Sequence, residues 1–186
     1  MNSAVIDRLG WMTFPGRQPP ACRIMAPGFK YNLTDIAAAI GINQLAKAEE
    51  MRLERESIAH QYLLEMAGLE EIELPPVDLD RIHAWHLFPV KLRLESLSID
   101  RNAFIDYLKD AGVACSVHWR PLHLHPYYEQ TFGWASSDFP VATAEWQRII
   151  SLPIFPGMSK DEIRHVIQTV QNACAQHSNS KQLITV

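Results

Sequence analysis

The stretch DIAAAIGINQLAKAEEM, residues 35–51, begins the most regular part of the sequence and decides how the rest is interpreted. Thr34 or Asp35 can cap a helix that starts here, because their side-chain oxygens accept hydrogen bonds from the free N–H groups of a first turn. Gly41 weakens such a helix by about 1 kcal/mol relative to alanine without forbidding it. Apolar residues then recur at helical spacing through residues 50–67, which predicts an amphipathic helix there. We therefore expect a long helical segment at the start of the domain.

Short strands follow this helical segment. The segments EIELPPVD (71–78), WHLFPVKLRL (85–94) and VACSVHW (113–119) are each expected to contain a strand. In the second of these, apolar and basic residues alternate after Pro89, so one face should be buried and the other exposed to water. Proline lacks a backbone donor, which predicts a sheet edge or a bulge at Pro89.

Further helices separate and follow the strands. Asp100 is expected to cap one, Pro140 to begin another that runs through Ile149, and Ser159 with Glu162 to form the capping box of the last. The segment SLPIFPGM between the last two is expected to be extended and turn-rich. A few strands separated by helices indicate the α+β class, with a small, mostly antiparallel sheet packed by helices.

Composition excludes several classes of partner. The 186 residues are 47% hydrophobic and carry a formal net charge of -4 without a long basic run, so nucleic acid is not an expected partner. The longest apolar run, residues 36–42, is far shorter than the ~20 residues of a membrane span. No secretory signal pattern is present at the start. Cys22, Cys115 and Cys174 are widely separated and are expected to be reduced thiols of a cytoplasmic protein.

The segment VHWRPLHLHPYY, residues 117–128, holds the histidines His118, His123 and His125. His123 and His125 have the HxH spacing that some metal sites use, but prolines bracket them and no nearby acid or cysteine completes a set of ligands. The residues alone leave three interpretations open: a metal site, a ligand-binding loop, or a turn-rich loop packed by its own Trp119, Leu122, Leu124 and Tyr127. Packing is the more ordinary of these, and no metal site is expected.

Four segments in order resemble one family. They are GFKYNLTDIAAAIGINQL (28–45), HAWHLFPVKL (83–92), GVACSVHWRPLHLHPYY (112–128) and SLPIFPGMSKDEI (151–163). Together they are similar to the C-terminal part of DegT/StrS-type sugar aminotransferases, and the resemblance covers roughly residues 22–173. These enzymes have the aspartate-aminotransferase fold (fold type I) and use pyridoxal phosphate (PLP). They transfer an amino group, usually from glutamate, to a keto group on a nucleotide-linked sugar.

The resemblance implies a division of the chain. Residues 1–27 would be the end of a large domain or a linker, residues 28–176 the small C-terminal domain, and residues 177–186 a loose tail. Family members are longer, and their large domain holds the Schiff-base lysine and the aspartate at the pyridine nitrogen. None of the six lysines here lies in a segment that resembles the Schiff-base motif. No catalytic residue is therefore assigned, and the chain is expected to be inactive alone.

The resemblance also assigns supporting residues. In the family, the loop that corresponds to GFKYN touches the PLP phosphate of a neighbouring subunit, so Asn32, Lys30 and Tyr31 are the expected cofactor-binding residues. An amide, an ammonium and a helix N-terminus all favour an anion. The alternative is that Asn32 only precedes the helix cap. By the same resemblance, His118 lies near the sugar nucleotide and Arg120 binds a phosphate.

The function implied is the C-terminal portion of a PLP-dependent nucleotide-sugar aminotransferase. Its partners would be a nucleotide sugar, an amino donor, and either a second copy or a large-domain partner. The alternative is a non-catalytic remnant or interaction module that dimerises with a full-length partner.

Overall fold

A computed structural model describes residues 33–78 and 80–179 of the chain. The chain divides into two units, residues 1–45 and 46–186, and the described part of the first unit is residues 33–45. The helix α2 is continuous over Asp35–Met66, so the two helices expected for residues 35–51 and 50–67 are one. Thr34 caps it, since its Oγ1 accepts a hydrogen bond from the N–H of Ala37 at 3.3 Å.

A three-stranded antiparallel sheet forms the centre of the second unit. Its strands are β1 (Ile72–Glu73), β2 (Phe88–Leu92) and β3 (Ile149–Leu152), in the order β1-β2-β3. Together with the helices α2 to α6 of the described residues, this confirms the α+β class and the small antiparallel sheet.

The strand assignments need three corrections. Residues 113–119 do not form a strand, and only Ser116 makes an isolated bridge, to Ser151. The third strand is instead Ile149–Leu152, which lies in the segment expected to be a helix end and a turn. Pro89 lies in the central strand, but β1 pairs only with Leu92 and Lys91 and ends before it. Pro89 has no backbone N–H to donate, and this is tolerated because the pairing between β1 and β2 ends before Pro89.

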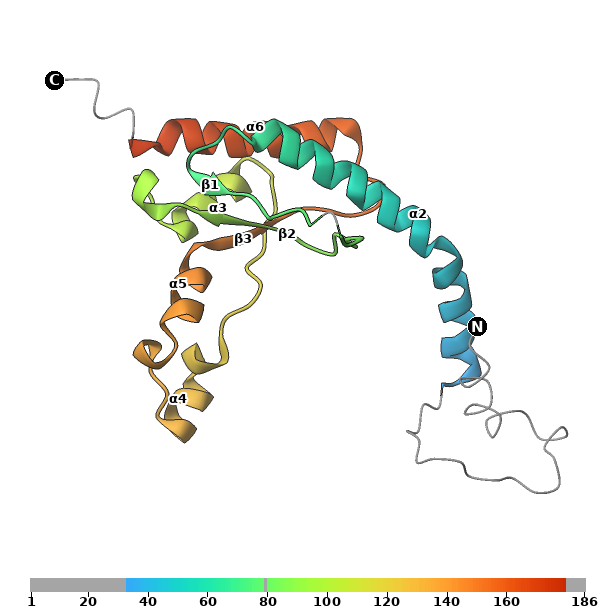
Figure 1. Cartoon of the computed structure of the whole chain (residues 1–186), viewed down its shortest axis with the longest axis horizontal. Coiled ribbons are helices and arrows are strands. Elements are labelled where there is room, and N and C mark those ends of the chain that lie inside the picture. Colours follow the sequence, from blue (N-terminus) through green and yellow to red (C-terminus); the bar gives the residue numbers. More distant parts are fainter. Residues whose placement is uncertain (1–32, 79, 180–186) are drawn as a thin grey trace, which may run out of the picture. The chain divides into compact units, whose positions relative to one another are not determined.

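The hydrophobic core lies on one face of the sheet. The side chains of Phe88, Val90, Leu92, Ile150 and Leu152 are all buried on this face, which we call the apolar face. In Figure 1, α6 (Lys160–His177) and the C-terminal part of α2 run side by side along the sheet, and α4 and α5 extend from its other side.

Helix α2 is held to the rest of the core by defined contacts. The ring of Tyr62 meets Phe88 edge-on at 5.1 Å between centroids, and its hydroxyl donates to the carbonyl of Pro153 at 2.8 Å. The side-chain amide of Gln171 on α6 donates to the carbonyl of Glu65 at 2.9 Å. The C-terminal part of α2 is therefore part of the domain core.

The caps predicted for two helices are confirmed. Asp100 accepts a hydrogen bond from Ala103 N–H at 2.9 Å and starts α3 (Arg101–Asp110). Ser159 and Glu162 form the reciprocal capping box of α6. These short-range features depend only on residues a turn apart, which is why the sequence predicts them well.

Residues 122–148 form a small helical arm. It contains the 3₁₀ turns Leu122–Leu124 and Ser136–Asp138, α4 (Pro126–Phe132) and α5 (Pro140–Arg148). Stacked aromatic rings join its parts. The ring centroid of Trp134 lies 5.7 Å from that of Tyr128 and 4.9 Å from that of Phe132.

The C-terminal end of α6 is tied to the loop before α3. The side chain of Asn179 donates to the carbonyls of Glu95 and Leu97, both at 3.0 Å, and Ser178 bridges to Leu97. Contacts therefore continue into the segment expected to be a loose tail, of which residues 180–186 lie outside the described residues. Of the described helices, none is long and apolar enough to cross a membrane.

Candidate functional site

The expected site residues fall into two groups. Lys30, Tyr31 and Asn32 lie outside the described residues, so their role at a cofactor phosphate stays a prediction. His118 and Arg120 are described, and both lie in the segment that joins α3 to the helical arm.

The second face of the sheet, which we call the polar face, carries Glu73, Lys91 and Ser151 between the buried apolar residues. Here Lys91 pairs with Glu73 at 3.3 Å and with Glu145 at 3.0 Å, and Arg148 pairs with Glu73 at 3.1 Å and with Glu145 at 2.6 Å. The hydrogen bonds from Arg148, and next those from Lys91, hold the pKa of both carboxyls below the ordinary value. These four residues attach α5 to β1 and β2.

Ser151 connects the polar face to His118. The Oγ atom of Ser151 lies 2.9 Å from Nδ1 of His118. In the backbone, Ser151 N–H donates to Ser116 at 2.7 Å and Ser116 N–H donates back at 3.1 Å. Ser151 is only 4% exposed, whereas His118 is half-buried. The imidazole is thus held against the sheet at one nitrogen.

Arg120 is exposed and available for an anion. Its guanidinium carbon lies 5.7 Å from the centre of the Trp146 ring, and that of Arg101 lies 4.6 Å from the same ring. Arg101 is nearly buried and also donates to the carbonyl of Trp146, which fixes the tryptophan at the start of α3. Within the described part of the chain, Arg120 makes no ion pair with a carboxylate.

The three histidines of the segment turn to different partners. His123 is buried, stacks on Phe139 and has its Nε2 2.8 Å from the Thr143 hydroxyl. His125 has its Nε2 3.2 Å from the carbonyl of Arg120. Across residues 33–78 and 80–179, no three His, Cys, Asp or Glu side chains gather as a metal site would require. The described geometry therefore gives the metal interpretation no support.

The interpretation of residues 117–128 as a loop packed by its own side chains is wrong for three of the four residues expected to pack it. The side chains of Trp119, Leu122 and Tyr127 are 78%, 57% and 66% exposed. The histidine His123 is the buried residue of this segment instead. The exposed aromatic and aliphatic groups leave this surface open to a ligand or to another protein surface.

Sequence reasoning missed Ser151. It lies in a segment expected to be extended and turn-rich, although it stands between the apolar residues Ile150 and Leu152 in the pattern of a strand. That alternation could have indicated a polar side chain on the outer face. The partner of Ser151, thirty-three positions away, could not be read from the sequence.

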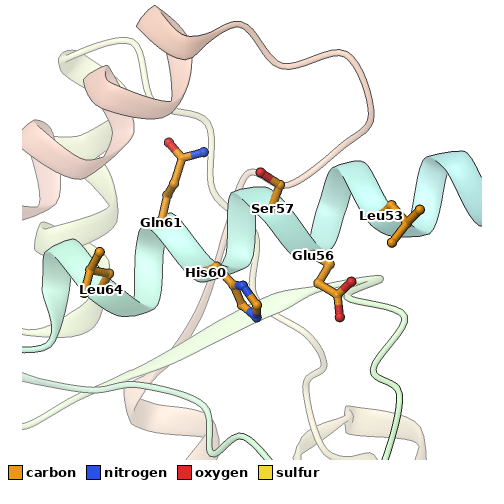
Figure 2. Close-up of a pocket in the computed structure, with 6 residues that line it drawn as sticks. All are labelled: Leu53, Glu56, Ser57, His60, Gln61 and Leu64. Atoms are coloured by element: carbon orange, nitrogen blue, oxygen red, sulfur yellow. The ribbon is translucent and has the colours of Figure 1, made fainter.

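Surface hollows lie elsewhere. Figure 2 shows one along α2, where Glu56 and His60 point to one side of the helix and Ser57 and Gln61 to the other. All its lining residues come from one helix, so no groups converge from separate elements on a ligand. We therefore place the candidate site at His118 and not at this hollow.

Comparison with known proteins decides the family. The model of the DegT/DnrJ/EryC1/StrS aminotransferase family matches residues 3–171. The chain belongs to this family. The resemblance seen in four segments is thereby confirmed over nearly the whole chain, and with it membership of a family of PLP-dependent sugar aminotransferases.

Two curated relatives and one solved structure show the extent of the similarity. The chain is 42% identical over 172 residues to the uncharacterized protein MJ1066 of Methanocaldococcus jannaschii, covering 92% of this chain and 45% of the relative. It is 33% identical over 168 residues to the spore coat polysaccharide biosynthesis protein SpsC of Bacillus subtilis, covering 90% of this chain and 43% of SpsC. The PLP-form of the putative sugar aminotransferase Spr1654 from Streptococcus pneumoniae matches with 29% identity and a TM-score of 0.71, over 83% of this chain and 39% of that one. The chain thus spans less than half the length of these relatives.

Proposed function

We propose that this chain forms the C-terminal, small-domain portion of a cytoplasmic, PLP-dependent nucleotide-sugar aminotransferase and is inactive alone. The complete enzyme would move an amino group from an amino acid such as glutamate to a keto group on a nucleotide-linked sugar. The observation that carries the proposal is the family match over residues 3–171, and the matches with MJ1066 and SpsC cover only 45% and 43% of those two relatives. Bound PLP supplies the electron-accepting ring for this transfer.

The environments of the lysines support inactivity of the chain alone. A lysine that attacks a carbonyl must lose its proton, which burial or a neighbouring cation favours. Lys91 instead lies between Glu145 and Glu73, and its hydrogen bond to Glu145 raises its pKa. Lys47, Lys109 and Lys160 are exposed. The lysines of the described residues therefore lack the surroundings of a nucleophile.

The expected phosphate loop fits PLP chemically but does not hold it firmly by itself. Asn32 and Lys30 offer an amide and an ammonium just before the N-terminus of α2. A helix N-terminus contributes about 0.3–2 kcal/mol toward an anion, and one charge-assisted hydrogen bond about 1.5–3 kcal/mol. A site with a Kd of about 1 μM needs about 8 kcal/mol. Further contacts from a large domain or a second copy are required.

His118 and Arg120 are the proposed substrate residues. An imidazole nitrogen can hydrogen-bond a sugar hydroxyl or a phosphate, and a guanidinium binds phosphate in a forked geometry. Both residues belong to one short segment, and the contacts of Ser116 with Ser151 attach the start of this segment to β3.

The alternative, a non-catalytic module that pairs with a full-length partner, is favoured by a different observation. In the first unit, α2 carries well-exposed apolar side chains on several sides of the helix, and Leu33 just before it is exposed too: Ile36, Ile40, Ile42 and Leu45 are those of the helix. A helix segment that is apolar all round is normally buried. Both proposals therefore expect another protein surface on this segment.

Titration of the purified chain with PLP, followed by borohydride reduction and mass analysis, tests the main proposal. We expect no stoichiometric PLP-modified lysine in this chain, whereas full-length Spr1654, which is known in a PLP-form, serves as the control for trapping. Co-expression with the part of Spr1654 that this chain does not match should restore trapping, on a lysine of that part, and amino transfer. A stoichiometric adduct on one lysine of the isolated chain would contradict the proposal. Stable association without restored transfer would favour the interaction module.

A further inference from the structure

Ser151 makes three hydrogen bonds to one short segment, residues 116–118. Two are the reciprocal backbone bonds to Ser116, and the third joins its Oγ to Nδ1 of His118. Ser116 and His118 are only two positions apart in the chain, so the bridge at Ser116 keeps His118 close to Ser151. The backbone bridge therefore places the imidazole, and the hydroxyl then fixes its rotation.

The other ring nitrogen of His118 is open. Of the described residues, the only buried side-chain nitrogen or oxygen without a hydrogen-bond partner is Nε of Arg55. Nε2 of the half-buried His118 has no hydrogen-bond partner among the described residues and is not fully buried. In a histidine, the hydrogen bond made by one ring nitrogen sets the role of the other.

We propose that Ser151 is a positioning residue, which holds His118 through Nδ1 so that Nε2 faces a hydroxyl or phosphate oxygen of a nucleotide-linked sugar. The choice of ligand rests on the proposed function. The hydrogen bond by which Ser151 fixes the orientation of the His118 ring, which we call the lock, does not. Arg120 lies two positions further along the same segment and supplies a positive charge that pairs with no carboxylate of the described residues. A ring nitrogen that can hydrogen-bond and a cation together suit a sugar joined to a diphosphate.

The lock is tested on the full chain by ¹⁵N NMR of the histidine rings, with His118 assigned from the signals lost in His118→Gln. We expect one defined pair of ring-nitrogen shifts for His118 in the native chain and averaged shifts in Ser151→Ala. Alanine keeps the backbone bridge, so the amide spectrum should show a folded protein. Ser151→Thr retains the hydroxyl and should restore the native ring shifts.

The chain offers a matched control. Thr143 holds Nε2 of His123 at 2.8 Å, a second hydroxyl–imidazole pair away from the proposed ligand. Thr143→Val should change the ring shifts of His123 and leave those of His118 unchanged. Native ring shifts for His118 in Ser151→Ala would overturn the proposed lock.

Titration with UDP-glucose tests the ligand part. We expect the probe to shift Nε2 of His118 in the native chain, and the Kd to rise roughly fivefold in Ser151→Ala, the equivalent of one neutral hydrogen bond. If Ser151→Ala releases the His118 ring but binds UDP-glucose with the same Kd as the native chain, the proposal that the lock aids ligand binding is overturned. A ring released in Ser151→Ala but insensitive to UDP-glucose in the native chain would overturn the nucleotide-sugar assignment and leave the lock standing.

Discussion

The two faces of the three-stranded sheet are formed by the same strands but make different interactions: apolar packing on one face, ion pairs and hydrogen bonds on the other. Phe88, Val90 and Leu92 point to the apolar face and are completely buried. Lys91 points the other way and pairs with carboxylates, and Ser151 on the neighbouring strand holds the ring of His118. Since side chains alternate along a strand, one short sheet can hold a domain together on one side and position a site on the other.

Truncation on the apolar face should have the largest effect on stability. The Phe88 side chain is fully buried and meets Tyr62 edge-on at 5.1 Å. Phe88→Ala removes this contact and leaves a cavity, so we expect the free energy of unfolding to fall by about 3–5 kcal/mol. Urea denaturation followed by circular dichroism measures the change.

The matched control for Phe88 is Phe155, which is 48% exposed. Phe155→Ala should cost clearly less, because fewer neighbours are lost and the remaining space is open to water. Equal losses for the two substitutions would mean that the apolar face is not the main source of stability.

A smaller loss of stability is expected when the hydroxyl of Tyr62, which lies within the apolar core, is removed. Tyr62 donates to the carbonyl of Pro153 at 2.8 Å, and burial raises the pKa of its phenol, which therefore remains a donor at neutral pH. Tyr62→Phe keeps the ring and removes the donor, which should cost about 1–2 kcal/mol in chemical denaturation.

Tyr127 provides the comparison for Tyr62, since it is 66% exposed. Tyr127→Phe should change the free energy of unfolding by no more than about 0.5 kcal/mol. A cost as large as that of Tyr62→Phe would show that the difference between buried and exposed hydroxyls does not hold here.

The apolar face was largely predictable and the polar face was not. Alternation of Val90 and Leu92 with Lys91 and Arg93 predicts the strand and its buried side, and the caps at Asp100 and Ser159 depend on residues three positions apart. These signals are local, so the sequence carries them directly.

The third strand depended on pairing distant in sequence. Ile149–Leu152 directly follows α5, and the alternation of Ile150, Ser151 and Leu152 is too short to show where the helix ends and the strand begins. It becomes a strand because Ile150 and Leu152 pair with Val90 and Phe88. The same long-range pairing brings Ser151 to His118, so the positioning contact was beyond the reach of sequence patterns even though the resemblance had indicated His118.

The smallest effect is expected from the ion pairs of the polar face. The guanidinium of Arg148, and next the ammonium of Lys91, lower the pKa of Glu145 from its ordinary 4.5. A carboxyl with a lowered folded-state pKa stabilises the fold above about pH 4.5, and this contribution is lost as the pH falls through the folded-state pKa. Because Glu145 is 38% exposed, solvent screening keeps its contribution below about 1 kcal/mol.

Denaturation of the native chain and of Glu145→Gln across the acid range measures this contribution. The native chain should be the more stable above about pH 5, and the difference should disappear as the pH falls well below 4.5. It should also shrink at about 1 M salt, where the screening length is about 3 Å. Glu50, an exposed residue that makes no ion pair in the described part of the chain, supplies the control Glu50→Gln. If the native chain stays more stable than Glu145→Gln at low pH, Glu145 acts by packing α5 on the sheet and not by its charge.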